Sequence, residues 1–218
     1  MNKKQRTVLV FGAIIVSNLL GMLSLQEPTQ MSITLTALPI LIVSFTMGWE
    51  MGYVAGLFGG IVQSINYGTL WYVFYTAILG GVSGYLAKNP RLNRRLGSVL
   101  FTIGVFFMYI VIAFENKNLL ASELFTILIS LLLFVILEYH LVKNHLGHNP
   151  LTNLTLAGCA GAAACIPYEM AVMTVVQNYG MVQLFAGVSK EVVQGYLTAI
   201  IAAVLLQSEP IKKIFKSR

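Results

Sequence analysis

Apolar segments fill most of this sequence, and the polar stretches between them are short. Eight segments can be distinguished, at about residues 7–25, 33–48, 51–66, 69–88, 97–114, 122–142, 152–177 and 183–207. A membrane-spanning helix needs about 20 apolar residues, within a range of about 17–25, so the short second and third segments leave six to eight spans. Only 10% of the residues are charged, whereas ordinary domains carry roughly 25%. The sequence therefore predicts an all-α protein, a polytopic integral membrane helical bundle.

The basic residues are distributed unevenly between the two sides of such a bundle. If the N-terminus is cytoplasmic and all eight segments span, twelve of the fourteen lysines and arginines fall on the cytoplasmic side. Cytoplasmic loops carry this excess, so we expect both termini in the cytoplasm of a multi-pass cell-membrane protein. The sharpest marker is KNPRLNRR, a predicted loop at 88–95. It divides a single transmembrane domain, 1–218, into helix groups at about 7–88 and 97–207.

Several classes of function are disfavoured. The net charge of +6 could indicate nucleic-acid binding, but the basic residues lie between and beyond apolar runs, so we expect the lipid bilayer and no nucleic acid as a partner. No phosphate-binding loop, metalloprotease motif or nucleophile elbow is present, so we expect no enzyme and no cofactor. We also expect no metal site, because no i, i+4 pair occurs among His140, His145 and His148.

A glycine recurs at every fourth position of GWEMGYVAGLFGG, at Gly48, Gly52, Gly56 and Gly60. Each interior glycine costs a soluble helix about 1 kcal/mol relative to alanine. In lipid, association between helices depends on close backbone contact, which small residues at this spacing allow. The ladder therefore indicates a packing face. It serves either the bundle itself or a partner membrane protein that slides against it.

Aromatic and amide side chains gather at the predicted outer ends of the helices. Either they form the aromatic belt common at membrane interfaces, or they surround the mouth of a site for a planar, polar ligand. On the second interpretation, the candidate substrate-binding residues are Asn66, Tyr67, Trp71, Tyr75, Glu115, Gln177 and Asn178.

Ionisable residues also occur inside the last two apolar segments. Glu169 lies about eight residues from the outer end of its segment, just after Pro167, and Lys190 and Glu191 lie at similar depth in the last segment. Gln194 continues a polar stripe with Glu191. Charges inside a span are costly and usually mark a site or pathway. They predict either a structural ion pair that includes Lys190, or the floor of a pocket that contacts substrate.

Three stretches together resemble the substrate-binding (S) components of energy-coupling factor (ECF) vitamin transporters. They are SITLTALPILIVSFTMGWEMGYVAGLFGGIVQSINYG, then AILGGVSGYLAKNPRLNRR, and the C-terminal LFAGVSKEVVQGYLTAIIAAVLLQSEPIKKIFK. The first has the family's early proline, at Pro39, its glycine-bracketed turn and its glycine-rich helix. The second ends in small residues and a basic stretch, and the third is similar to the family's last helix and basic tail.

The resemblance implies a division of labour. This chain would bind a vitamin or related small molecule from outside, while a transmembrane coupling protein and two ATPase subunits would drive its release inside. The same glycine-rich arrangement also resembles the membrane domain of Lyt-type sensor kinases, so a sensor or scaffold is the alternative. A neighbouring gene for a coupling protein or for a kinase would separate the two.

Overall fold

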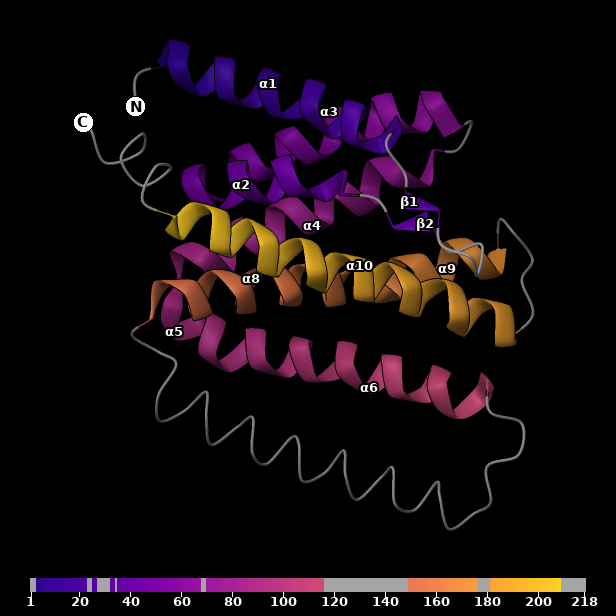
Figure 1. Ribbon diagram of the computed structural model, residues 1–218. Helices are drawn as coiled ribbons and strands as arrows, with labels where there is room; N and C mark the ends of the chain where they lie inside the picture. Colours follow the sequence, from indigo (N-terminus) through magenta and orange to yellow (C-terminus); the bar gives the residue numbers. More distant parts are fainter. Residues whose placement is uncertain are drawn as a thin grey trace.

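The computed structural model describes residues 3–22, 25–26, 32–33, 35–67, 70–115, 149–175 and 181–208. Their elements are α1 (Lys3–Met22), β1 (Leu25–Gln26), β2 (Ser32–Ile33), α2 (Ala37–Met47), α3 (Trp49–Tyr67), α4 (Trp71–Lys88), α5 (Pro90–Leu92), the π-helical turn η1 (Asn93–Gly97), α6 (Ser98–Glu115), α8 (Pro150–Ala164), α9 (Ile166–Val175) and α10 (Met181–Gln207). Long helices lie side by side (Figure 1). This confirms the predicted all-α bundle; the predicted segment 122–142 lies outside the described residues.

The helices run between two ends of the bundle that differ in chemistry (Figure 1). At one end α1 begins, α4 ends and α6 begins, and α10 also ends there; we call it the basic end, because Lys88 and three arginines of α5 and η1 lie at it. At the other end α4 begins with Trp71 and Tyr72, and α9 lies beside it; we call it the aromatic end. The described basic cluster thus occupies one end, as the distribution of charges in the sequence predicts.

One sequence-based boundary was wrong. The predicted loop 88–95 is helical from Pro90 onward, because proline is well suited to the first turn of a helix, where its missing N–H leaves no hydrogen bond unmade. The predicted apolar segment 152–177 corresponds to one long apolar stretch, Pro150–Val175, which a turn at Cys165 divides into α8, ending at Ala164, and α9, beginning at Ile166. A short antiparallel pair, in which Leu25 faces Ile33, also precedes α2; hydropathy alone gives no signal for it.

The glycine ladder of α3 faces α4 at backbone contact. A Cβ atom on Gly52 would lie 3.0 Å from the carbonyl carbon of Gly80, and one on Gly60 would lie 2.6 Å from the Tyr72 carbonyl oxygen. At the α2–α3 junction Gly48 has φ +93°, a conformation that side chains rarely adopt, and its carbonyl group abuts Gly84. Within the described residues, this face is therefore filled by α4 of the same chain.

Small residues also let α8 lie deep inside the bundle. The run from Leu156 to Ala163 is buried throughout, and α8 contacts α4, α6 and α10. Its core neighbours include Leu41, Phe45 and Leu79. With alanine and glycine along one helix, three others can approach it closely, which is the packing expected where lipid supplies little hydrophobic drive.

The outer surface of the bundle is apolar. Phe11, Phe58, Phe74 and Val99 are each more than half exposed, and such extensive apolar exposure marks a surface that contacts lipid or protein. Within the described residues, Pro150–Val175 and Gly187–Gln207 are long and apolar enough to cross a membrane, and 7–20 and 37–47 are shorter apolar helices.

Candidate functional site

The aromatic end brings together α4, α9 and α10. The break between α8 and α9 creates this junction: Cys165 is a turn residue, and α9 begins with Pro167 near its first position. The Cys165 thiol donates to the carbonyl oxygens of Gly161 (3.3 Å) and Tyr75 (3.5 Å), and so ties the break to α4. The Glu169 amide closes the first turn of α9 by donating to the Cys165 carbonyl at 3.0 Å.

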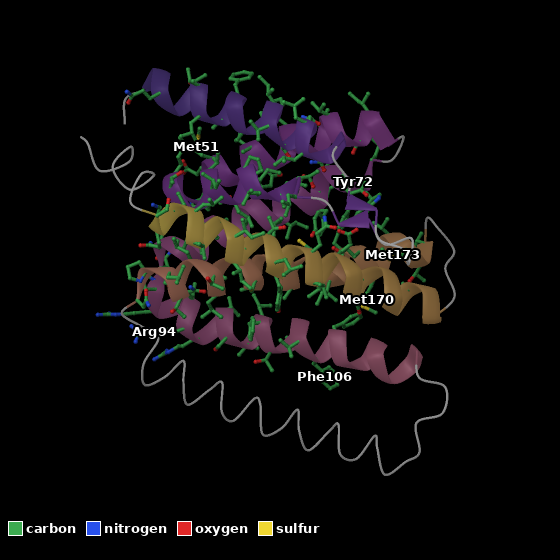
Figure 2. The ribbon with its side chains drawn as sticks, viewed as in Figure 1. Met51, Tyr72, Arg94, Phe106, Met170 and Met173 are labelled. Carbon is green, nitrogen blue, oxygen red and sulfur yellow. The ribbon has the colours of Figure 1, made fainter. Side chains whose placement is uncertain are left out.

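Aromatic rings from the first turns of α4 form one wall of this junction. The Trp71 ring stacks on Tyr72 with centroids 4.2 Å apart, and meets Tyr75 edge to face at 5.7 Å. Tyr168 of α9 joins them, because its hydroxyl donates to the Trp71 carbonyl at 3.0 Å and its ring lies 6.0 Å from that of Phe74. Figure 2 shows Tyr72, Met170 and Met173 at this same end.

Glu169 is the unusual group of the cluster. Its side chain is 1% exposed, and neither of its carboxyl oxygens has a hydrogen-bond partner. The Glu191 carboxyl group, the Tyr75 hydroxyl and the Cys165 thiol all lie within electrostatic range of it. Two acidic groups thus lie close together, the buried Glu169 and the half-buried Glu191, and the Glu169 oxygens have no hydrogen-bond partner. Burying such a group is expensive unless something else pairs with it.

Helix α10 supplies the remaining polar groups. Gln194 is 9% exposed and Thr198 is fully buried, so the polar stripe faces the interior. The Thr198 hydroxyl is used within the helix, donating to the Gln194 carbonyl at 2.7 Å. The Tyr75 hydroxyl reaches α10 at Gly195, where a Cβ atom would lie 3.8 Å from it. Glu191, Gln194 and Tyr75 therefore line one junction between α4 and α10.

The structure brings five of the predicted site residues into this cluster: Trp71, Tyr75, Glu169, Glu191 and Gln194. For four others it describes only the backbone: Asn66 and Tyr67 in the last turn of α3, Glu115 at the end of α6, and Lys190 beside Glu191 in α10. Gln177 and Asn178 lie outside the described residues.

Sequence reasoning missed two members of the cluster, Cys165 and Tyr168. Both flank Pro167, so the signal that was available was the proline itself, which disturbs a helix and redirects the residues around it. Which way they turn depends on contacts with α4, and no spacing rule supplies that information.

The fold and this cluster define a class: a helical integral membrane protein with an acidic, aromatic cluster where its helices meet at one end. The chain belongs to the family described as thiamine transporter protein (Thia_YuaJ), whose model matches residues 7–119, just over half of the 218 residues. It is therefore a membrane protein of vitamin transport. No curated protein and no solved structure matches it. The matched part ends before α8, so Glu169 and Glu191 lie outside it.

Proposed function

We propose that this protein is the S component of an ECF-type transporter, and that its solute is thiamine or a close analogue. It would be a multi-pass protein of the cell membrane, with both termini cytoplasmic and the aromatic end facing outward. The arginines at the basic end support this orientation, because basic residues accumulate on the cytoplasmic side. The family's description supports the choice of vitamin.

The observation that carries the proposal is the buried Glu169 carboxyl group without a hydrogen-bond partner. Thiamine has a permanent positive charge on its thiazolium ring and an amino group on its planar pyrimidine ring. A buried carboxylate with no partner costs several kcal/mol, and a cationic ligand that donates hydrogen bonds offsets that cost. A cation between Glu169 and Glu191 favours the ionised forms of both acids and an anion disfavours them, so the acidic pair supports a cationic vitamin over an anionic one.

The aromatic wall fits the same ligand. Trp71 and Tyr75 offer ring faces and edges to two planar rings, and a cation over such a face gains about 0.5–2 kcal/mol. Gln194 adds an amide at the α10 side. We keep Asn66, Tyr67, Glu115, Gln177, Asn178 and Lys190 as further candidate contacts around the mouth.

We further propose that a transmembrane coupling protein and two ATPases complete the transporter. These 218 residues contain no phosphate-binding loop, which is consistent with a transporter in which other chains hydrolyse ATP. Co-expression tests this: thiamine uptake into vesicles should require the coupling chains, whereas thiamine binding by this protein alone should not.

The two tryptophans provide a direct binding assay. Trp71 lies in the cluster, whereas Trp49 begins α3 at the basic end and is 52% exposed. In detergent, thiamine should quench the fluorescence of the Trp49→Phe variant saturably. It should leave Trp71→Phe unquenched. If thiamine instead quenches the Trp71→Phe variant, which keeps Trp49, the ligand binds at the basic end and the proposed site is wrong.

Two acid-to-amide variants test the role of charge. Glu169→Gln should weaken thiamine binding at least about 30-fold, the lower range for losing one partner of a buried charge pair. Glu50→Gln, at an exposed position in the first turn of α3, is the matched control and should bind like the wild type. Equal affinity of Glu169→Gln and wild type would contradict the site.

A further inference from the structure

The basic end carries a cluster that vitamin binding does not explain. Arg91, Arg94 and Arg95 lie in α5 and η1, and residues three and four apart share a helix face. Arg91 and Arg95 are exposed and Arg94 is half-buried; Figure 2 labels Arg94 at this end, opposite the aromatic cluster. Like charges at this spacing repel one another. A bound anion would therefore stabilise this turn.

The described protein does not neutralise these charges. The Arg94 Nε atom is buried and has no hydrogen-bond partner, and a buried donor left unsatisfied destabilises the folded protein. Among the described side chains, the acidic group at this end is that of Glu50, which is exposed. No ion pair between Glu50 and an arginine is found among these described side chains. The nearby Lys88 ammonium already donates to the Thr46 carbonyl at 3.0 Å.

The arginines are held on a fixed support. Asn93, which is fully buried at the start of η1, donates to the main-chain and side-chain oxygens of Asn153, both at 2.8 Å. The Asn153 amide in turn donates to the Ala87 carbonyl at 3.1 Å. These bonds tie the π-helical turn to α4 and α8, and such turns occur frequently at functional sites.

An apolar stripe continues from the arginines along α6. Val99, Ile103 and Phe106 follow Arg95 at intervals of four, four and three residues, so all four lie on one helix face. Their side chains are 55%, 45% and 41% exposed. Cationic groups at one end of an exposed apolar stripe match an amphiphile that has an anionic head and apolar chains.

We propose that this arginine face, Arg91, Arg94 and Arg95 with the adjoining stripe Val99, Ile103 and Phe106, binds an anionic phospholipid of the cytoplasmic leaflet. The lipid phosphate accepts hydrogen bonds from the exposed guanidinium groups of Arg91 and Arg95, and the half-buried Arg94 adds its positive charge beside them. The acyl chains lie along α6. Basic pockets on the cytoplasmic side of helical bundles bind anionic headgroups in this way. The inference uses the proposed orientation but not the identity of the vitamin.

Lipid competition monitored by native mass spectrometry tests the proposal. Full-length protein in detergent is mixed with equal amounts of phosphatidylglycerol and phosphatidylcholine, and the bound ratio is measured. The wild type should retain phosphatidylglycerol preferentially. Each neutralised arginine should reduce that preference roughly fivefold, so R91Q/R94Q/R95Q should lose it by roughly 100-fold. Elution as a single species in size exclusion shows that the variant is folded. If the triple variant does not fold, Arg94→Gln alone is measured instead and should reduce the preference roughly fivefold.

A charge-matched variant distinguishes this face from a general effect of charge. K212Q/K213Q/K216Q also removes three positive charges, but takes them from the C-terminal tail. This variant should keep the preference for phosphatidylglycerol. Equal loss in both triple variants would overturn the proposal. So would displacement of the lipid by millimolar inorganic phosphate, which would indicate a site for free anions. If the arginine variant keeps the lipid but loses copurifying coupling subunits, the face binds protein and the proposal is wrong.

Discussion

Replacing Gly56 with alanine tests the close contact between α3 and α4. A Cβ atom at Gly56 would lie 2.6 Å from the Thr76 carbonyl carbon and 2.9 Å from the Ala77 Cα atom, and both are backbone atoms. Ordinary contact begins near 3.4 Å, so the helices must separate by at least about 0.8 Å, which forfeits a quarter to a half of each local dispersion contact. The separation also stretches the 2.6 Å hydrogen bond from the Thr76 hydroxyl to the Gly56 carbonyl.

The expected cost of this change exceeds what alanine contributes to helix propensity. Overpacking costs about 1–3 kcal/mol and the hydrogen bond about 1 kcal/mol, while alanine gains about 1 kcal/mol over glycine. A net loss of about 1–3 kcal/mol lowers the melting temperature of a chain this long by roughly 2–12 °C.

The matched control for Gly56→Ala is Gly81→Ala. A Cβ atom at Gly81 meets only the Tyr53 side chain, at ordinary distances of 3.5 and 3.6 Å. Thermal unfolding in detergent, followed by tryptophan fluorescence, should show Gly56→Ala well below the wild type and Gly81→Ala at or above it. If Gly56→Ala melts with or above Gly81→Ala, the backbone-contact reasoning is refuted.

Three further changes have definite outcomes. Glu169→Met should abolish thiamine binding while stabilising the free protein by about 1–4 kcal/mol in thermal unfolding, because it replaces a buried acid without a hydrogen-bond partner by an apolar side chain; a less stable variant would contradict this. Tyr196→Phe removes the 2.7 Å bond to the Phe101 carbonyl and should cost about 1 kcal/mol with affinity unchanged. Asn153→Ala leaves Asn93 without its acceptor side chain and should lower the melting temperature by several degrees, again with thiamine affinity unchanged.

Hydropathy predicts the long helices well because burial in lipid or in a helical core requires the same apolar runs. The predicted segments 69–88, 97–114 and 183–207 differ from α4, α6 and α10 by two residues or fewer at each end. The break at Cys165 could not be read in this way, since the run on both sides of it is apolar. Pro167 indicates a disturbed helix near this point, but the exact position of the break depends on tertiary contacts of α8 and α9 with α4.

The site, like the helices, could be predicted where the signal lies in the local sequence and could not be predicted where it depends on tertiary contacts. Glu169 is conspicuous in the sequence because an acid in an apolar run demands an explanation. Trp71 and Tyr75 were predicted at the outer mouth of a site and Glu169 at its floor, but the sequence did not predict which of their atoms come together. That the Tyr75 hydroxyl reaches α10 at Gly195 follows from helix separation, which depends on small residues elsewhere in the bundle.

Glycines outside the cluster should therefore control its affinity. Gly195→Ala would set a Cβ atom 2.5 Å from the Ala162 Cβ, and Gly158→Ala would set one 2.5 Å from the Ala199 Cβ, so both changes push α8 and α10 apart to a similar degree. Gly195 adjoins Gln194 in the cluster, whereas the Gly158–Ala199 contact lies one helical turn farther toward the basic end. Both variants should lose comparable thermal stability, about 1–3 kcal/mol. Only Gly195→Ala should lose thiamine affinity in addition, by about 10-fold or more, because displacement of about 1 Å disrupts a positioned contact. Equal affinities in the two variants would mean that the α8–α10 spacing does not set the geometry around Glu169.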